Sequence, residues 1–278
     1  MKIVTDSTAD LTKELAEEYD IEIVPLTVRL GDRTFRDYYD MSPVEFYQML
    51  EETEGFPTTS QPSVEEFRKT YEKLGSREEI VSIHISMGIS STCQSAGVAL
   101  QQLRGWNVTI IDSRFTSVGL GLIALEAAKA ARAGADLQEV INLVEKLKSK
   151  TEIFFSVDSL DYLQKGGRIG KAQAFVGGML KIKPFLAFRD GMVVPVEKIR
   201  GSSKLIRRMV ELIKDDAKED KIVKAAFIWG ESNEQVAKLI EQLNDSVQLE
   251  EVYRNNIGTV ITSHTGPTTF GVAYFCED

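Results

Sequence analysis

Two short runs in the sequence are rich in side-chain hydroxyls, and each lies where a loop or strand gives way to a predicted helix. The runs are Thr58-Thr59-Ser60-Gln61-Pro62-Ser63 and Ser86-Met87-Gly88-Ile89-Ser90-Ser91-Thr92. The first turn of a helix exposes backbone N–H groups without intrahelical partners, and neighbouring hydroxyls add donors that carry no fixed charge. A carboxylate or a phosphate would suit such a site. A third polar cluster, Ser263-His264-Thr265-Gly266-Pro267, lies near the other end of the sequence, so a site that uses all three is assembled by folding.

The composition is that of a globular protein. The 278 residues are 43% hydrophobic and 27% charged, which is enough for one large core or two modest cores, and we expect two. The formal net charge of -9 argues against a nucleic-acid binder, because phosphate recognition usually leaves a basic footprint.

The cysteines and the apolar segments indicate a reduced, cytoplasmic setting. The two cysteines, Cys93 and Cys276, show no spacing typical of a metal site or a disulfide framework. A strand is predicted directly at Lys2 to Thr5, which leaves no room for a signal peptide, and no apolar run approaches the length of a membrane span. We therefore expect a cytoplasmic protein.

The first half of the sequence predicts a parallel sheet covered by helices. Residues 3–5, 80–85 and 108–112 are short runs rich in Val and Ile, and each is followed by a helical pattern. Two helix starts are well marked, because Ser42 and Ser63 are plausible N-caps with Glu three residues later. The small, apolar segment 117–132 predicts a helix pressed closely against a sheet or a ligand.

The pattern changes after Lys150. Residues 185–188 and 192–196 flank Asp190-Gly191, which is a strong signal for a β-hairpin. Further strands are predicted at 222–229, 247–253, 258–262 and 271–275, with a helix ending at Leu243. We therefore predict an α/β fold with two domains. The first, residues 1–150, is a parallel-sheet α/β domain, and the second, residues 151–278, is a mixed or antiparallel α/β domain with a β-hairpin.

A segment early in the second domain offers a cationic side chain. Residues 158–165 predict a short helix that the pair Gly166-Gly167 stops, which leaves Arg168 just beyond the break, where it can face a cleft. The next stretch, Ala172 to Leu180, is small and apolar. It fits either a helix in the core or the wall of an apolar pocket, and sequence alone favours the core.

Many short motifs occur in the order and spacing of the DegV family, and the sequence resembles that family over nearly its whole length. The motifs are Asp6-Ser7-Thr8-Ala9-Asp10-Leu11, Thr58 to Ser63, Ile89-Ser90 leading to Gln94-Ser95-Ala96, Leu160-Asp161-Tyr162-Leu163, Lys165-Gly166-Gly167-Arg168-Ile169, Lys183-Pro184, Lys198-Ile199-Arg200 and His264-Thr265-Gly266-Pro267. The resemblance implies a two-domain protein that binds one long-chain fatty acid, such as palmitate, between its domains. It also implies similarity to the lipid-binding subunit of a bacterial fatty-acid kinase, which presents the carboxylate to a separate ATP-binding kinase subunit.

The resemblance assigns the carboxylate to the hydroxyl runs. Thr59 and Ser90 are the leading carboxylate donors, with Thr58 and Ser91 as neighbours. Ser and Thr at helix starts more commonly act as N-caps. The resemblance overrides that interpretation for Thr59 and Ser90, and both interpretations stay open for Thr58 and Ser91. The family usually has Gly-Thr-Tyr where this chain has Ser91-Thr92-Cys93, which predicts a roomier pocket near Cys93.

Four basic or titratable side chains complete the predicted assignment. His264 is expected on a turn after a late strand, and the resemblance places it beside the carboxylate as a hydrogen-bond donor. The resemblance also implies that Arg168 closes the head-group end and that Arg200 contacts the partner subunit, although both residue types are ordinarily solvated or ion-paired at surfaces. His84 lies within an apolar strand and is interpreted as structural.

Other function classes lack their motifs. A serine hydrolase needs G-x-S-x-G, and the run Gly88 to Thr92 lacks the second Gly. A nucleotide-dependent kinase needs a phosphate loop with Gly and Lys, which Gly166-Gly167-Arg168-Ile169 does not resemble. We therefore predict no catalytic residue in this chain alone, no metal, and no cofactor beyond a bound fatty acid. A plain lipid carrier without phosphoryl transfer stays open as the alternative.

Overall fold

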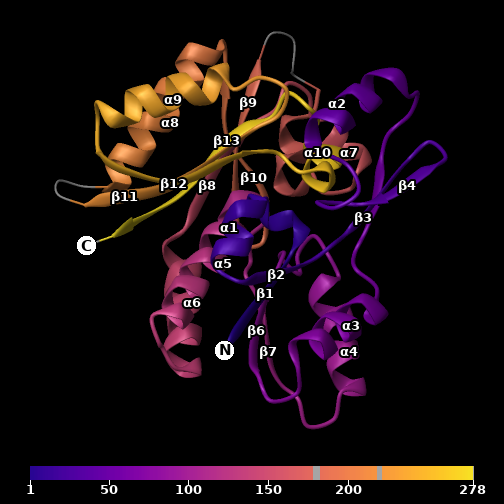
Figure 1. Ribbon diagram of the computed structural model, residues 1–278. Coiled ribbons are helices and arrows are strands. Elements are labelled where there is room, and N and C mark those ends of the chain that lie inside the picture. The colour runs from indigo at the N-terminus through magenta and orange to yellow at the C-terminus, as the bar shows by residue number, and fades with distance from the viewer. Residues whose placement is uncertain (178–181, 218–220, 278) are drawn as a thin grey trace.

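The computed structural model describes residues 1–177, 182–217 and 221–277, in which the strands form three sheets (Figure 1). The first is a four-stranded parallel sheet in the order β2-β1-β6-β7. Its strands are β1 (Lys2–Asp6), β2 (Ile21–Val24), β6 (Glu79–His84) and β7 (Asn107–Asp112). The prediction of a parallel sheet in the first half is confirmed, although the pattern did not reveal β2.

The second sheet has six strands in the order β10-β9-β8-β13-β11-β12. It consists of β8 (Glu152–Ser156), β9 (Lys183–Arg189), β10 (Met192–Ile199), β11 (Ile222–Trp229), β12 (Gln248–Asn256) and β13 (Phe270–Glu277). Only β11 and β12 pair in parallel, and the other neighbours are antiparallel. The mixed α/β class predicted for this chain is therefore correct.

Ten α-helices and two 3-10 turns lie in the described ranges. They are η1 (Ser7–Ala9), α1 (Lys13–Glu18), α2 (Pro43–Glu52), α3 (Val64–Leu74), α4 (Thr92–Gln102), α5 (Ser117–Arg132), α6 (Leu137–Lys150), α7 (Asp161–Lys165), η2 (Gly170–Phe175), α8 (Ser202–Ala217), α9 (Glu234–Asn244) and α10 (Thr259–Thr265). The predicted capping boxes of α2 and α3 are both present, so local sequence signals suffice to start these helices.

Helices cover both faces of each large sheet. Side chains alternate along β1 and β6, so Val4 and Ile80 pack with α3 and α4, while Ile3 and Ile83 pack with α5. Helices α8 and α9 cover one face of the six-stranded sheet, and α5 and α6 approach the other (Figure 1). Helix α5 therefore lies between the two sheets and joins their cores.

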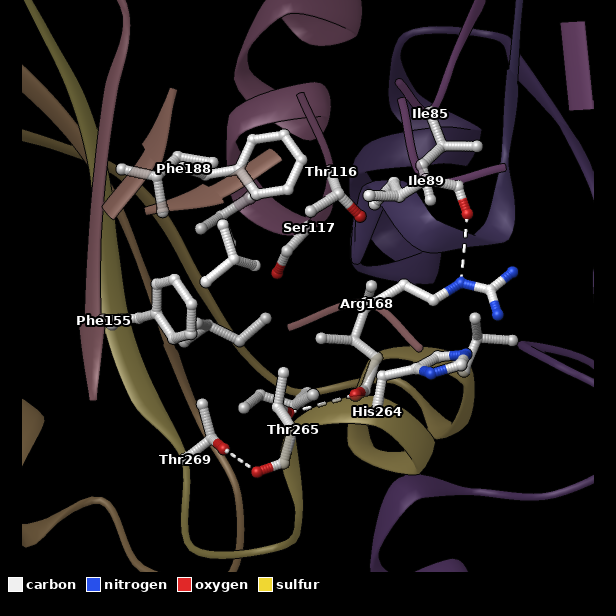
Figure 2. A pocket seen from close by; sticks show the side chains of 18 of the residues that line it. Ile85, Ile89, Thr116, Ser117, Phe155, Arg168, Phe188, His264, Thr265 and Thr269 are labelled. Carbon is white, nitrogen blue, oxygen red and sulfur yellow. Dashed lines mark hydrogen bonds between the residues drawn. The ribbon is translucent and has the colours of Figure 1, made fainter. Parts of the chain in front are cut away.

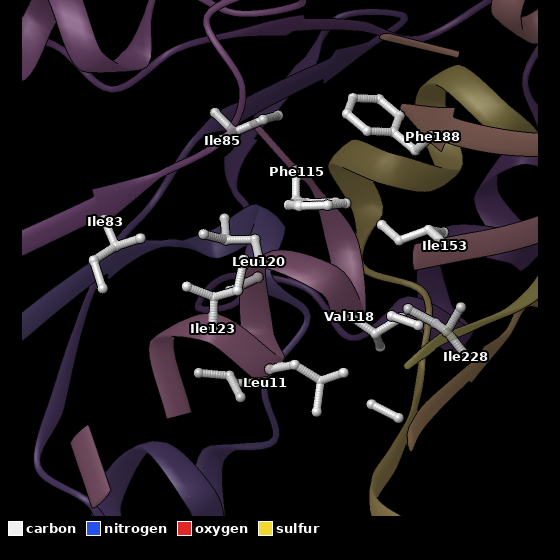
Figure 3. Packing of buried hydrophobic residues seen from close by; sticks show 14 of the residues in the cluster. Leu11, Ile83, Ile85, Phe115, Val118, Leu120, Ile123, Ile153, Phe188 and Ile228 are labelled. Carbon is white, nitrogen blue, oxygen red and sulfur yellow. The ribbon is translucent and has the colours of Figure 1, made fainter. Parts of the chain in front are cut away.

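The close packing predicted for α5 depends on its glycines. A Cβ at Gly119 would lie 2.5 Å from Cδ1 of Ile153, and one at Gly121 would lie 2.0 Å from the Tyr253 hydroxyl. Both distances are shorter than van der Waals contact, so these positions exclude larger residues. Figure 3 shows Val118, Leu120 and Ile123 of this helix among apolar side chains of both sheets.

The predicted hairpin joins β9 to β10. Asp190 has a φ of 51° and Gly191 a φ of 78°, as a two-residue type I′ turn requires. Ser86 donates a hydrogen bond of 2.9 Å to the Gly191 carbonyl. The hairpin of the second half therefore rests directly on the hydroxyl-rich run of the first half.

A small antiparallel sheet carries the first hydroxyl run. It has the order β4-β3-β5, with β3 (Thr27–Leu30), β4 (Arg33–Arg36) and β5 (Thr58–Ser60). Its apolar side chains pack with α2 and with Val260 of α10. The sheet therefore connects the N-terminal half with the C-terminal helix α10.

The strand predicted at 258–262 is wrong, because these residues begin α10. The Gly258 N–H donates to Asp10 Oδ1 and the Thr259 N–H donates to Asp37 Oδ1, both at 3.0 Å. Carboxylates at a helix N-terminus satisfy free N–H groups and favour the helix. These caps come from the far end of the sequence, so the local run of β-branched residues gave a misleading signal.

The apolar stretch 172–180 is only partly described, because residues 178–181 lie outside the described ranges. Within the described part, Ala172 is buried in the largest core cluster, whereas Gln173 and Val176 are exposed. No helix in the described residues has the length and apolarity to cross a membrane. The same residues contain no group of three or more His, Cys, Asp or Glu side chains that could hold a metal ion.

Candidate ligand-binding slot

A narrow cavity of about 100 Å³, which we call the slot, lies between the two large sheets and α10 (Figure 2). Most of its lining is apolar. Its apolar residues are Leu26, Ile85, Ile89, Val118, Ile153, Phe155, Leu163, Phe188, Val193, Ile228, Ile257, Val260, Ile261, Gly271 and Val272. Its polar residues are Thr59, Gln61, Ser90, Thr116, Ser117, Arg168, His264, Thr265 and Thr269.

The apolar wall of the slot is also part of the protein core. Ile85, Val118, Ile153, Phe188 and Ile228 belong both to the slot lining and to the largest core cluster (Figure 3). Burying apolar surface is favourable by roughly 25 cal/mol per Å². An elongated apolar ligand in the slot would therefore extend the core between the two sheets.

Thr59 lies on β5, and its side chain points inward. Its hydroxyl lies 2.7 Å from Nε2 of His264. The neighbouring Thr58 is exposed and does not line the slot, as expected from the alternation of side chains along a strand. The helix that follows is capped by Ser63, so neither Thr58 nor Thr59 acts as its N-cap.

Ser90 lines the slot and also supports the start of α4. Its Oγ accepts a hydrogen bond of 3.3 Å from the Thr92 N–H and lies 2.9 Å from the Thr92 hydroxyl. Ser91 is the N-cap residue of α4, but its side chain makes no capping bond and does not line the slot. Cys93 is buried near the Ile85 carbonyl, outside the slot lining.

Arg168 brings a positive charge to the slot. Its Nε donates to the Ile89 carbonyl at 3.1 Å (Figure 2), and its guanidinium also donates to the Gly166 carbonyl at 2.8 Å. Among the described residues, no carboxylate forms an ion pair with it. A half-buried guanidinium whose hydrogen bonds go to carbonyl groups is electrostatically suited to an anion.

His264 lies on α10 rather than on a turn, which corrects the expectation from the sequence. Burial, and secondarily the Arg168 charge, lowers the pKa of His264 from 6.5 to about 4. The ring is therefore neutral near pH 7 and carries one N–H. Its Nε2 contacts Thr59, whereas its Nδ1 is buried without a hydrogen-bond partner in the described structure.

Two buried carboxylates hold α10, and with it His264, in place. Asp10 and Asp37 cap its N-terminus, and Asp10 Oδ2 also accepts a hydrogen bond of 2.6 Å from Ser117, a slot residue. Burial raises the pKa of both carboxyl groups. Asp10 belongs to the motif after the first strand, so that motif helps to position the slot wall.

The structure therefore brings Thr59, Ser90, Arg168 and His264 together in one cavity. Arg200 is exposed just after β10, outside the slot lining. Sequence reasoning missed Thr116, whose buried Oγ1 has no hydrogen-bond partner in the described structure. The sequence does place a Thr directly before α5, where its side chain would normally cap the helix. In the structure Thr116 forms no such capping bond.

Two further slot hydroxyls, those of Thr265 and Thr269, donate hydrogen bonds within the protein. Thr265 donates to the Ile261 carbonyl, and Thr269 donates to the Thr265 and Gly266 carbonyls, each at 3.0 Å. Because their hydroxyl hydrogens are already donated, Thr265 and Thr269 do not need a ligand as a hydrogen-bond acceptor. Among the described residues, the polar groups of the slot with unused hydrogen-bonding capacity include the Arg168 guanidinium, His264 Nδ1 and Thr116 Oγ1.

The fold and the slot define an α/β protein with an apolar cavity between a parallel and a mixed sheet. The DegV family, described as uncharacterised proteins, matches residues 1–277. The chain is 38% identical to protein DegV of Bacillus subtilis (strain 168) over 274 residues, covering 98% of both chains. The protein therefore belongs to the DegV family.

Solved structures of related proteins have the same fold. A DegV family protein from Thermus thermophilus, described by its fatty acid binding, superposes with a TM-score of 0.94 at 37% identity, covering 99% of both chains. DegV from Bacillus subtilis, described as a fatty acid binding protein, has a TM-score of 0.90 at 36% identity, again covering 99% of both chains. A stearic acid-binding protein from Eubacterium ventriosum has a TM-score of 0.89 at 29% identity, covering 99% and 97%.

Proposed function

We propose that the slot binds one long-chain fatty acid, with its carboxylate near Thr59, Ser90, Arg168 and His264. The observation that carries this proposal is the charge of Arg168, which no carboxylate of the described residues compensates, at the wall of an otherwise apolar slot. A fatty acid supplies both the missing anion and an apolar chain. The described fatty-acid binding of related proteins supports the same ligand class.

The energetics of a fatty acid match this distribution of side chains. Each buried CH₂ contributes roughly 0.8 kcal/mol, so the affinity grows with the length of the chain in the apolar part. An unpaired buried carboxylate would cost far more than one such group provides. The hydroxyls and the guanidinium at the polar end are the groups that would offset this cost.

We further propose that the bound acid is presented to a separate ATP-binding kinase subunit. One carboxylate oxygen would attack the γ-phosphorus of ATP, the bond to the bridging oxygen would break, and acyl phosphate and ADP would form. The partner must supply the nucleotide site, because this sequence has no Walker-type loop. Arg200, exposed after β10, is the proposed contact with that partner.

A plain lipid carrier is the second candidate. The solved relatives are described by their fatty-acid binding alone. A carrier would need the slot but would not need Arg200. The two candidate functions therefore predict different effects of replacing one exposed side chain, Arg200.

The experiment compares wild type, Arg200→Ala and the charge-matched control Arg104→Ala, which alters an exposed residue after α4. Each protein is titrated with oleate, then mixed with oleate, ATP and the ATP-binding partner from its own organism. We expect all three to bind oleate. We expect ADP release only with both proteins present, and Arg200→Ala alone to reduce it. ADP release by this chain alone would contradict the kinase-subunit proposal. The absence of ADP release with every partner tested would also contradict it and would favour the plain lipid carrier.

A further inference from the structure

Gly166 has a backbone conformation that any residue can adopt. It follows α7 with φ -71° and ψ -10°, which is the ordinary right-handed helical region. The next glycine differs, because Gly167 has a φ of +71°, where glycine is favoured. The backbone therefore explains the second glycine of the pair but not the first.

The space around Gly166 explains why a side chain is absent. A Cβ at this position would lie 2.3 Å from Nδ1 and 3.1 Å from Cε1 of His264. The imidazole edge thus occupies the place of any larger side chain. The same Cβ would lie 2.9 Å from the Tyr162 carbonyl oxygen, which is the acceptor of the Gly166 N–H in the last turn of α7.

The position of the ring determines which nitrogen carries the proton. A proton on Nδ1 would point toward Gly166, where Nδ1 has no hydrogen-bond partner among the described residues. Buried N–H groups without an acceptor are rarer in proteins than buried acceptors without a donor. A proton on Nε2 is donated to the Thr59 hydroxyl oxygen at 2.7 Å. The geometry therefore favours the Nε2–H tautomer, in which Nδ1 carries no proton and lies against the glycine.

This tautomer also sets the role of Thr59. In this tautomer the Oγ1 of Thr59 accepts a hydrogen bond from the Nε2–H of His264, so Thr59 can donate its own hydroxyl hydrogen to another group. Thr59 lines the slot. The hydroxyl is thus held as a donor for an acceptor in the slot.

We infer that Gly166 is a positioning residue: its missing side chain lets the His264 ring hold the Thr59 hydroxyl as a donor toward the slot. The inference rests on the proposed function in one respect, because it identifies the acceptor as the fatty-acid carboxylate. His264 then acts through Thr59 rather than by donating to the carboxylate itself.

The first test measures binding of oleate to Gly166→Ala. Displacing the ring removes an oriented hydrogen bond to a charged group, worth roughly 1.5–3 kcal/mol, so the affinity should fall about 10-fold to 150-fold. The matched control is Gly97→Ala on α4, where an added Cβ meets nothing within 4 Å. The control should keep the wild-type affinity. An unchanged affinity in Gly166→Ala would overturn the inference.

A double-mutant cycle separates the His264 contact from the Tyr162 contact. In the His264→Ala background no ring remains to be displaced, so Gly166→Ala should cause no further loss of affinity. The Tyr162 contact is present in both backgrounds, so its effect should appear equally in both melting temperatures of the lipid-free protein. Additive losses of affinity would show that Gly166 acts independently of His264 and would overturn the inference.

A spectroscopic test needs no ligand. The chain has two histidines, so imidazole ¹⁵N signals of lipid-free protein can be assigned with the His264→Ala variant. We expect the Nε2–H tautomer at His264 in wild type, and a change of this signal, but not of the His84 signal, in Gly166→Ala. The Nδ1–H tautomer in wild type, or no change in the variant, would overturn the inference. If wild type bound no fatty acid, the proposed function would fail, and this spectrum would still decide the role of Gly166.

Discussion

The two histidines of this chain lie in opposite environments. His84, on β6, is fully buried, with Nε2 2.7 Å from the Ser82 hydroxyl and Nδ1 3.0 Å from Asp6 Oδ2. Within the described ranges, His264 at the slot has one hydrogen-bond partner for Nε2 and none for Nδ1. Asp6 is itself satisfied, because it also accepts from the Ile85 N–H and from Thr8.

This difference in hydrogen bonding distinguishes polar groups that stabilise the fold from polar groups that can bind a ligand. Buried polar groups are nearly always hydrogen-bonded, so each exception calls for an explanation. The network around His84 is complete, and a ligand could add nothing to it. The slot contains a histidine with one unsatisfied nitrogen and a guanidinium, that of Arg168, which forms no ion pair with the described carboxylates. An anion could use both groups.

The largest expected effect tests this contrast directly. His84→Ala leaves Ser82 and Asp6 each without one buried hydrogen-bond partner, and at roughly 1–3 kcal/mol for each it should lower the free energy of unfolding by roughly 2–6 kcal/mol. His264→Ala removes one hydrogen bond and should cost roughly 1 kcal/mol. Urea unfolding of the lipid-free proteins measures both. Equal losses would mean that the two histidines have the same structural role.

A smaller effect is expected where charge develops during phosphoryl transfer. Arg168→Met keeps the length of the side chain but removes its charge, and the rate of acyl-phosphate formation with the partner should fall about 100-fold to 1,000-fold. Binding of oleate should weaken less, because the phosphoryl group adds charge that the bound acid lacks. The control Arg104→Met should behave as wild type. Equal losses in binding and turnover would place Arg168 only in lipid binding.

The hydroxyl groups of the slot should affect ligand binding more than folding. Thr59→Ala, Ser90→Ala and His264→Ala should each weaken oleate binding about 10-fold to 150-fold, since each affects hydrogen bonding to a charged group. The neighbouring variants Thr58→Ala and Ser91→Ala are matched controls and should bind normally, because these side chains lie outside the slot lining. Isothermal titration measures affinity. If melting temperature fell in step with affinity, the hydroxyls would serve the fold instead.

The smallest expected effect is a pH dependence at His264. Its pKa is about 4 in the folded protein and about 6.5 when unfolded. Between these values only the unfolded chain binds the proton, so stability falls as the pH falls. Relative to His264→Ala, wild type should lose roughly 1–2 kcal/mol between pH 7 and pH 5.

Urea unfolding of both lipid-free proteins at several pH values measures this difference. Burial raises the pKa values of Asp10 and Asp37, so these groups change stability with pH in the opposite direction. Both residues are present in both proteins, so their contribution cancels in the difference. A difference that stays constant with pH would place the His264 ring in solvent.

The features that sequence predicted well are those with local causes. The capping box at Ser42 and the turn at Asp190-Gly191 depend on a few consecutive residues, and both are present. Helix α10 depends on Asp10 and Asp37, which are 248 and 222 residues away from the groups they cap. No window of sequence contains both partners, so this helix was predicted as a strand.

The slot residues also divide into those that the sequence identified and those that only the folded structure reveals. Thr59, Ser90, Arg168 and His264 were named through the resemblance to the DegV family, and all four line the slot. Thr116 was missed because a Thr before a helix usually caps it, and only the folded structure shows its hydroxyl unpaired. The role of Gly166 was likewise hidden, because it depends on a ring about 100 residues away in the sequence.

The most direct measurement of the central claim is the mass of the purified protein under native and then denaturing conditions. If the slot binds a fatty acid, protein made in bacteria should carry about one per chain, and denaturation should release it as a long-chain acid. Thr59→Ala and Arg168→Met should carry less, whereas Thr58→Ala should match wild type. Protein without stoichiometric fatty acid that also fails to bind added palmitate or oleate would contradict the claim.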